Sequence, residues 1–263
     1  MRCRGFTLVE LVITLVVLAI LALGISSYIG LGARMYSDAA EREQVLGQSR
    51  FVAERMVREL RNAVPNSIAE ESTGSLARTC LIFRPILFSG IYTKLPHTEK
   101  DTSIEVISPG LTNADSGTLL VVYPTKPADF ALTGQGPGKA VVINKIELID
   151  SDTAHFKLSF SDSFQFSHQS PEQRFYIAGD EVRYCAMRMG SDAKIYRNGV
   201  LMAEGLVLTF NSNSGAPVFM PPVFSVDNPT LTRNSVVNIF LQFGYGGNAD
   251  MFFNYEVHIP NVP

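Results

Sequence analysis

The stretch Gly5-Phe6-Thr7-Leu8-Val9-Glu10, followed by the uncharged residues Leu11–Ile25, decides the architecture of this 263-residue chain. As an α-helix, residues 6–25 are roughly 30 Å long, which is enough to cross the hydrocarbon core of a bilayer. Glu10 is the only charged residue between Arg4 and Arg34. An acidic side chain deep in a membrane helix is unfavourable by roughly 2.5–3.5 kcal/mol, so Glu10 is a candidate functional residue.

Two general interpretations of this segment follow from hydropathy and charge. In the first it is a plain single-pass anchor, and Arg2 and Arg4 keep the N-terminus cytoplasmic by the positive-inside rule. In the second it is a secretory signal peptide, with Leu11–Leu21 as the apolar region and Ala22-Leu23-Gly24 as the cleavage site. Against the second interpretation, Glu10 lies where an uninterrupted apolar region should begin.

A third interpretation rests on the order of the residues from Arg4 to Glu10, which resembles the prepilin leader of type IV pilins and type II secretion pseudopilins. The resemblance implies that a prepilin peptidase cuts after Gly5 and methylates Phe6, the new N-terminal residue. It also implies that Glu10 meets the free N-terminal amine of a neighbouring subunit when helices bundle into a filament. Such a pair is strong in a low-dielectric bundle only when both partners are present. The alternative role for Glu10 is a side chain that snorkels to the membrane surface.

Residues 33–64 predict a second, amphipathic half of the same helix. Apolar or small side chains recur every three or four residues, at Val45, Gln48 or Ser49, Val52, Met56, Leu60 and Ala63. Charges occupy the other faces and form three opposite-sign pairs at i,i+4 spacing, namely Arg50–Glu54, Glu54–Arg58 and Arg55–Glu59. Pro65 is expected to end the helix, because proline is excluded from helix interiors.

The remaining residues predict a β-rich head, because short β-like runs alternate with turns. The expected strands are Thr79–Arg84, Ile104–Ile107, Thr118–Tyr123, Ala140–Ile149, Phe156–Phe160, Phe175–Ile177, Glu181–Met187, Ile195–Tyr196, Val200–Met202, Leu206–Phe210, Val236–Phe243 and Phe252–Ile259. Hairpins are expected at Ala178-Gly179-Asp180 and at Asn198-Gly199, the latter a strong two-residue turn signal. The predicted fold is α+β, a long N-terminal helix packed on an antiparallel sheet. Its parts are a leader (1–5), a transmembrane half-helix (6–32), an amphipathic half-helix (33–65) and a periplasmic head (66–263).

Two longer stretches narrow the resemblance. The block Phe175–Leu208, which contains Ile195-Tyr196-Arg197-Asn198-Gly199, resembles the central sheet of J-type minor pseudopilins. Residues 4–65, including Glu59-Leu60-Arg61-Asn62-Ala63-Val64-Pro65, are similar to minor pilins of mannose-sensitive haemagglutinin (MSHA) pili. The resemblance implies a low-abundance pilus subunit whose partners are other minor and major pilins, prepilin peptidase, a polymerising ATPase and the inner-membrane assembly platform.

The chain has three cysteines, Cys3, Cys80 and Cys185. A cut after Gly5 removes Cys3 with the leader and leaves two. Cys80 and Cys185 are then candidates for a disulfide in an oxidising periplasm, and the alternative is two buried thiols that never meet. Sequence alone does not bring their Cβ atoms within bonding range.

Several kinds of chemistry lack support in the sequence. The net charge of −3 provides no basic footprint for nucleic acid. Residues 134–139 (GQGPGK) do not fit a phosphate-binding loop, because Thr133 and Ala140 stand where it requires Gly and Ser or Thr. The four histidines show no metal-ligand spacing, and Asp150, Asp152 and Asp162 are interpreted as turn residues, with a calcium site as the alternative. No enzyme activity, cofactor or metal is predicted.

The sequence thus predicts a minor pilin or pseudopilin that begins in the inner membrane and moves into a pilus serving adhesion. A J-like pseudopilin of a type II secretion system is the alternative within the same class. A membrane-anchored periplasmic binding or sensor protein is the alternative from another class.

Overall fold

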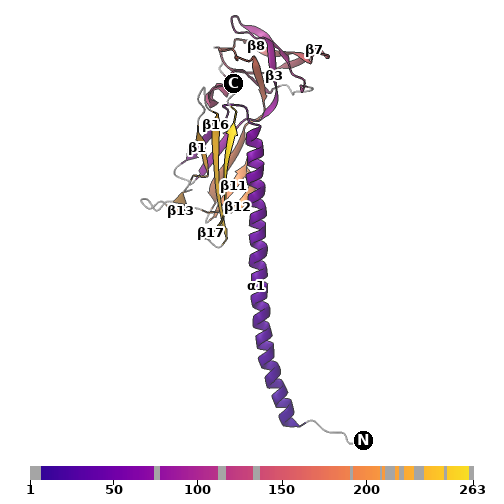
Figure 1. Ribbon diagram of the computed structural model, residues 1–263, viewed down its shortest axis with the longest axis vertical. Coiled ribbons are helices and arrows are strands. Elements are labelled where there is room, and N and C mark those ends of the chain that lie inside the picture. The colour runs from indigo at the N-terminus through magenta and orange to yellow at the C-terminus, as the bar shows by residue number, and fades with distance from the viewer. Residues whose placement is uncertain are drawn as a thin grey trace. The chain divides into compact units, whose positions relative to one another are not determined.

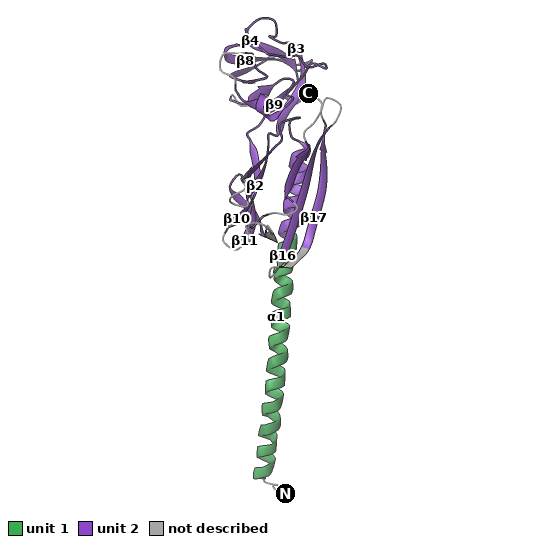
Figure 2. Cartoon of the chain, turned by 90° about the vertical axis from the view of Figure 1, so that its left-hand side faces the viewer, with its two compact units in different colours: residues 1–47 green, residues 48–263 purple. Residues whose placement is uncertain are grey.

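The computed structural model describes residues 7–73, 78–111, 117–132, 137–189, 192–207, 209–210, 217–218, 222–227, 234–245 and 248–260. The chain forms two compact units, residues 1–47 and 48–263 (Figure 2). Helix α1 (Leu8–Arg61) contributes residues to both units, and antiparallel strands make up the rest of the second. The predicted α+β, pilin-like fold is confirmed.

Helix α1 runs without a break through the glycines of its apolar half, Gly24, Gly30 and Gly32. It ends at Arg61, four residues before Pro65, which has no N–H to donate to the Arg61 carbonyl. The backbone of the next residues bonds to a different segment instead: the Val64 N–H donates to the Arg84 carbonyl at 2.8 Å. The Ile86 N–H donates to the Asn62 carbonyl at 2.9 Å.

Within the second unit, one face of α1 is buried as the spacing predicts. Ser49, Val52, Met56 and Leu60 are fully buried, and Ala63 lies just beyond the helix on the same stripe. The charged residues of this part lie on the other faces. Full burial of a Val, Leu or Met side chain contributes about 1.5–3 kcal/mol each, so this stripe holds the helix in the head.

The larger sheet, called here the main sheet, has eight strands (Figure 1). They are β1 (Ala69–Thr73), β2 (Arg78–Phe83), β10 (Val182–Met189), β11 (Asp192–Arg197), β12 (Val200–Leu206), β15 (Phe224–Asp227), β16 (Ser235–Tyr245) and β17 (Asn248–Ile259). Their order is β1-β2-β10-β11-β12-β16-β15, with β17 paired to β16 along its length. The β11–β12 hairpin turns at Asn198 and Gly199, with φ values of 47° and 82°, as the Asn-Gly signal predicts. A separate two-stranded sheet joins β13 (Thr209–Phe210) to β14 (Pro217–Val218).

The second large sheet, called here the inserted sheet, has seven strands in the order β6-β5-β9-β3-β4-β8-β7. They are β3 (Ile86–Lys94), β4 (Asp101–Ile107), β5 (Leu119–Val121), β6 (Ala140–Val142), β7 (Lys145–Asp150), β8 (His155–Phe164) and β9 (Arg174–Ala178). A short 3₁₀ helix, η1 (Pro127–Phe130), lies between β5 and β6.

The inserted sheet interrupts the main sheet between two neighbouring strands. β2 and β10 pair directly, with Phe83 opposite Val182, yet the chain between them builds the whole second sheet. It leaves through Arg84-Pro85 and returns through Gly179, whose N–H donates to the Pro85 carbonyl at 2.9 Å. The hairpin predicted at 178–180 is therefore wrong. The strands on either side of that turn, β9 and β10, belong to different sheets because each pairs with strands far away in sequence.

An aromatic core fills the inserted sheet. Phe160, Phe164 and Phe166 pack edge to face, with Phe164 and Phe166 ring centroids 4.9 Å apart. The sheet rolls around this core: Gly138 forms a parallel bridge with Phe166, and the Asn144 N–H donates to the Ser159 carbonyl at 2.8 Å. This switch of partner from β5 to β8 divides the single strand predicted over 140–149 into β6 and β7.

Strand β3 is absent from the prediction because Ser89-Gly90 interrupts its apolar pattern. The structure shows why glycine stands there. A Cβ atom on Gly90 would lie 2.2 Å from the Ile107 carbonyl oxygen and 2.9 Å from the Phe175 ring. Only glycine therefore allows β3 to approach β4 and the core ring of β9 this closely.

Candidate assembly site and head surfaces

The residues predicted for processing and assembly lie at the start of the chain. Gly5 and Phe6, the proposed cleavage and methylation positions, lie outside the described residues, as does Cys3. Glu10 is described and stands in the first turn of α1. An acidic side chain at this place interacts favourably with the positive end of the helix dipole.

Thr7 caps the helix and contacts Glu10. The Thr7 carbonyl accepts the N–H groups of Glu10 at 3.1 Å and Leu11 at 3.2 Å. The Thr7 hydroxyl lies 3.4 Å from both the Glu10 backbone nitrogen and the Glu10 carboxylate. The residue types have the Thr-x-x-Glu spacing of a capping box, and here the Thr7 hydroxyl lies between the Glu10 backbone N–H and the Glu10 carboxylate.

The surface around Glu10 is apolar and unburied. Every side chain from Leu8 to Ile29 is exposed, including Leu8, which is 80% exposed, and Tyr28, which is 78% exposed. α1 is long and apolar enough to cross a membrane. An apolar helix of this length is stable in a bilayer or against other apolar helices. In water its whole apolar surface would be exposed, which is unfavourable. Glu10 is thus a single carboxylate on a surface otherwise suited to lipid or helix contacts.

In the head, a charged network joins α1 to the main sheet. Glu59 accepts hydrogen bonds from Arg55, at 2.8 Å, and from Arg197 on β11, at 3.0 Å. Of the three i,i+4 pairs predicted on this helix, Arg55–Glu59 forms an ion pair, and Glu54 makes none among the described residues. Arg197 comes from the Tyr-Arg-x-Gly strand that carried the resemblance to pseudopilins, so this arginine ties the sheet to the helix.

Burial and charge act in opposite directions on Glu59. Burial alone would raise the pKa of this carboxyl, but the hydrogen bonds from Arg55 and Arg197 outweigh it and hold the pKa below its ordinary value. The Tyr184 hydroxyl is buried near this carboxylate and meets hydrogen-bond geometry with no described residue. Burial, followed by the negative charge of Glu59, raises the pKa of Tyr184, which therefore stays neutral.

The lowered pKa of Glu59 predicts a pH-dependent contribution to stability. Because the folded-state pKa is below the unfolded value of roughly 4.3, the contribution is present above that value and is lost as pH falls through the folded pKa. We expect Glu59→Gln to lower the free energy of unfolding by about 1 kcal/mol at pH 7 and by less at pH 3, where Glu59 is closer to being protonated. Urea unfolding at both pH values measures this, with Glu54→Gln as the control. An equal loss at both pH values would contradict the electrostatic account.

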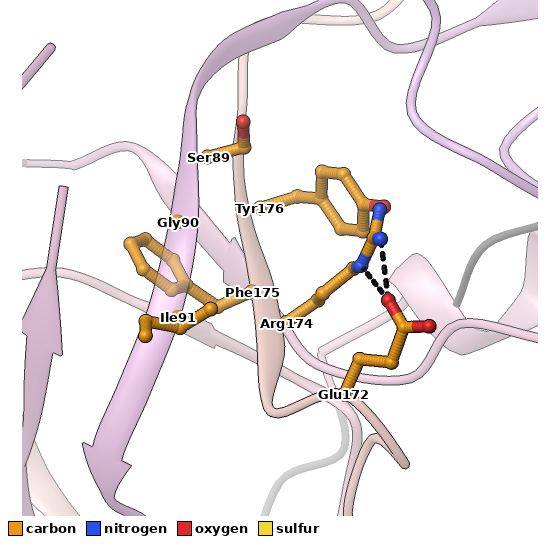
Figure 3. A pocket seen from close by; sticks show the side chains of 7 residues that line it. All are labelled: Ser89, Gly90, Ile91, Glu172, Arg174, Phe175 and Tyr176. Carbon is orange, nitrogen blue, oxygen red and sulfur yellow. Dashed lines mark hydrogen bonds and ion pairs between the residues drawn. The ribbon is translucent and has the colours of Figure 1, made fainter. Parts of the chain in front are cut away.

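A shallow groove of about 310 Å³ lies on the inserted sheet, where β3 and β9 pair (Figure 3). Its lining comes from β3, from β9 and from a residue two positions before β9: Ser89, Gly90, Ile91, Glu172, Arg174, Phe175 and Tyr176. The Arg174 Nε donates to the Glu172 carboxylate at 2.7 Å, beside the Tyr176 ring. Burial raises the pKa of Tyr176, and the charge of Arg174 partly offsets it. The groove offers one neutralised ion pair and a neutral phenol, which suits weak polar contacts.

The structure joins Cys80 and Cys185 in a disulfide, across the strand pair β2–β10. The two residues are directly opposite one another in register. Asp150 closes a turn, as the sequence analysis interprets it, by accepting the Asp152 N–H at 3.0 Å and the Thr153 hydroxyl at 2.7 Å. Among the described residues, no group of three or more His, Cys, Asp or Glu side chains is placed to hold a metal ion.

Comparison with known families adds one finding. The family model of the prokaryotic N-terminal methylation motif matches residues 1–26. No curated protein and no solved structure matches the chain. The match supports a type IV pilin-like protein, which is a structural class, and α1 fits the single-pass inner-membrane anchor of a prepilin.

Proposed function

We propose that this chain is a minor subunit of an MSHA-type type IV pilus, acting in pilus assembly or initiation and in adhesion. The observation that carries the proposal is the methylation motif over residues 1–26. It overlaps the exposed apolar half of α1, in which Glu10 is the one acidic residue. The finer choice of pilus rests on the resemblance of residues 4–65 to the MSHA pilus biogenesis protein MshO.

Processing creates the partner for Glu10. Prepilin peptidase hydrolyses the peptide bond between Gly5 and Phe6, and the freed amine of Phe6 is methylated. The amine keeps its positive charge and stands at the tip of an apolar helix. When subunits bundle, this amine and the Glu10 carboxylate of a neighbour neutralise one another in a low-dielectric environment. An offset in register would leave both charges unpaired, so the pair favours one vertical position.

The working cycle follows from the apolar helix. Before assembly the subunit lies in the inner membrane, with its N-terminus in the cytoplasm and its head in the periplasm. The assembly platform, driven by the polymerising ATPase, transfers the helix from lipid to the core of a filament of minor and major pilins. The lipid bilayer and the filament core are both apolar, so the apolar surface of the helix stays covered during the transfer. The filament differs in that it pairs Glu10 with a charged amine.

Mass spectrometry of the mature N-terminus tests this proposal. We expect a chain that begins at Phe6 and carries one methyl group on its amine. An intact Met1 would support a plain anchor, and a chain that begins at Ile25 would support a signal peptide. Either result would contradict the prepilin assignment.

Two other functions have a specific observation in their favour. The resemblance of residues 175–208 to J-type pseudopilins favours a type II secretion system, and the neighbouring genes separate it from a pilus. The groove on the inserted sheet favours a membrane-anchored binding or sensor protein, whose helix would never enter a filament. Deleting the gene and scoring both piliation and type II secretion separates this last function, which predicts neither defect, from the other two.

A further inference from the structure

The disulfide lies on the face of the main sheet that is turned away from the helix. Successive side chains of a strand point to opposite faces. Tyr184 lies on the helix face, because it sits near Glu59 of α1 and its ring is 5.9 Å from the Arg197 guanidinium. Cys185 follows Tyr184 directly and therefore points the other way, as does its partner Cys80. The sulfurs are thus outside the core between helix and sheet.

Arg78 lies against both sulfurs on that outer face. Its Nε is 3.2 Å from Cys80 Sγ, and one terminal nitrogen is 3.9 Å from Cys185 Sγ. Although the cysteines are buried, Arg78 is only half-buried, so its side chain stands between the bond and water. Arg78 is therefore one of the side chains that cover the bond on this face.

The other charges on this face are already paired. On β1 and β10, Glu71 forms an ion pair with Arg183, which also binds Glu181 at 3.0 Å. On β11, Lys194 binds Glu204 at 2.6 Å, and Tyr196 lies opposite Cys185. Within the described residues Arg78 makes no ion pair, so the sulfur atoms are what its guanidinium faces.

We propose that Cys80–Cys185 is a redox-sensitive latch whose reduced form Arg78 stabilises. A dithiol reductant attacks one sulfur, and the S–S bond breaks. The reductant leaves as its own disulfide, and the chain gains two electrons and two protons as Cys80 and Cys185 thiols. A positive charge next to a thiol favours its thiolate. Stabilising a reduced thiolate makes a disulfide easier to reduce, as it does in strongly oxidising thiol–disulfide proteins.

The position of the latch gives reduction a structural consequence. The bond joins β2 and β10, the strands through which the chain enters and leaves the inserted sheet. Opening it leaves that junction held by backbone pairing and by contacts such as the Arg84 side-chain hydrogen bond to the Gly179 carbonyl, at 3.1 Å. The fitting partner is a periplasmic oxidoreductase with a reactive dithiol. This proposal is independent of filament assembly.

The test is an equilibrium titration of the full chain in detergent with reduced and oxidised dithiothreitol. Thiols are counted by alkylation in a Cys3→Ser background, so that two cysteines titrate. A tenfold stabilisation of the thiolate is at the low end for an adjacent opposite charge. The equilibrium constant for reduction by dithiothreitol should therefore be about fivefold larger for the unchanged protein than for Arg78→Gln at pH 8.5. At pH 6 the two constants should be equal. Arg61→Gln, with the same charge change on exposed helix, should behave like the unchanged protein.

Arg78→Lys is the second variant, and it should keep part of the pH-dependent difference because it keeps a cation near the sulfurs. Thermal melts of the oxidised proteins confirm that each variant is folded. Equal reduction of the unchanged protein and Arg78→Gln at both pH values would overturn the proposal. So would a difference that is the same at pH 6 and pH 8.5, since a merely structural effect of Arg78 would not follow thiolate formation.

Discussion

Replacing Glu10 by alanine should reduce incorporation into filaments at least about 100-fold while leaving the protein in the inner membrane. Breaking a buried ion pair by removing one partner costs about 3–5 kcal/mol, because the other charge stays buried and unpaired. Each 1.4 kcal/mol is a factor of ten in the equilibrium, so the loss exceeds two orders of magnitude. Insertion into the membrane should improve slightly, since the variant has no carboxylate in its apolar run.

Sheared and membrane-bound fractions, compared by immunoblot, measure this effect. Glu10→Gln should behave like Glu10→Ala, because it keeps the size and loses the charge. Glu41→Ala is the matched control, since Glu41 is an exposed acid further along the same helix. Thr7→Val should cause a smaller defect, of about 1 kcal/mol, by removing the helix cap but not the charge. Normal piliation by Glu10→Ala would remove the assembly role of the carboxylate.

The second large effect concerns the disulfide. We expect Cys80→Ala combined with Cys185→Ala to lower the free energy of unfolding of the head by about 2–4 kcal/mol. The bond joins residues 105 positions apart, so in the chain-entropy model it removes many conformations from the unfolded state. That loop contains all seven strands of the inserted sheet, and without the bond its two ends are held only by non-covalent contacts.

Urea unfolding of the full chain in detergent, followed by tyrosine fluorescence, provides the measurement. Cys3→Ser is the control, because the proposed processing would remove Cys3, and its loss should change nothing. An unfolding midpoint unchanged by the double substitution would show that reduced and oxidised heads are equally stable, contrary to this expectation.

Local patterns in the sequence were sufficient for the helix and for one hairpin. The uncharged run after Glu10 and the spacing of Val52, Met56 and Leu60 fix the helix and its buried face, because both depend on residues within a few turns of one another. The Asn198-Gly199 turn was equally local, since its positive φ values need those residue types. Each of these features is set by neighbours in the chain.

Features that depend on distant pairing could not be predicted. Nothing in the turn at 178–180 shows that β9 pairs with β3 and β5 while β10 pairs with β2, and the hairpin prediction failed there. The same holds for the residues just after α1, where Asn62 and Val64 bond to residues twenty or more positions away.

The site residues divide in the same way. Glu10 stands out because its charge is costly where it lies, and Thr7 was within reach as part of a Thr-x-x-Glu pattern. The roles of Arg197 and Arg78 could not be predicted from the sequence. Each acts on a group from another element, Glu59 in one case and Cys185 in the other, and only the fold brings them together.

The place of the inserted sheet has a consequence for how such a chain can change over generations. Its two ends leave from Phe83 and Val182, which are paired across adjacent strands and so are about 5 Å apart. A turn of a few residues could span that gap, and so could any other domain with neighbouring termini. The main sheet and its helix contacts would close unchanged beneath either one. The junction between β2 and β10 is therefore an insertion point. Whole domains can be inserted or deleted there without a change in the main sheet or in its contacts with α1.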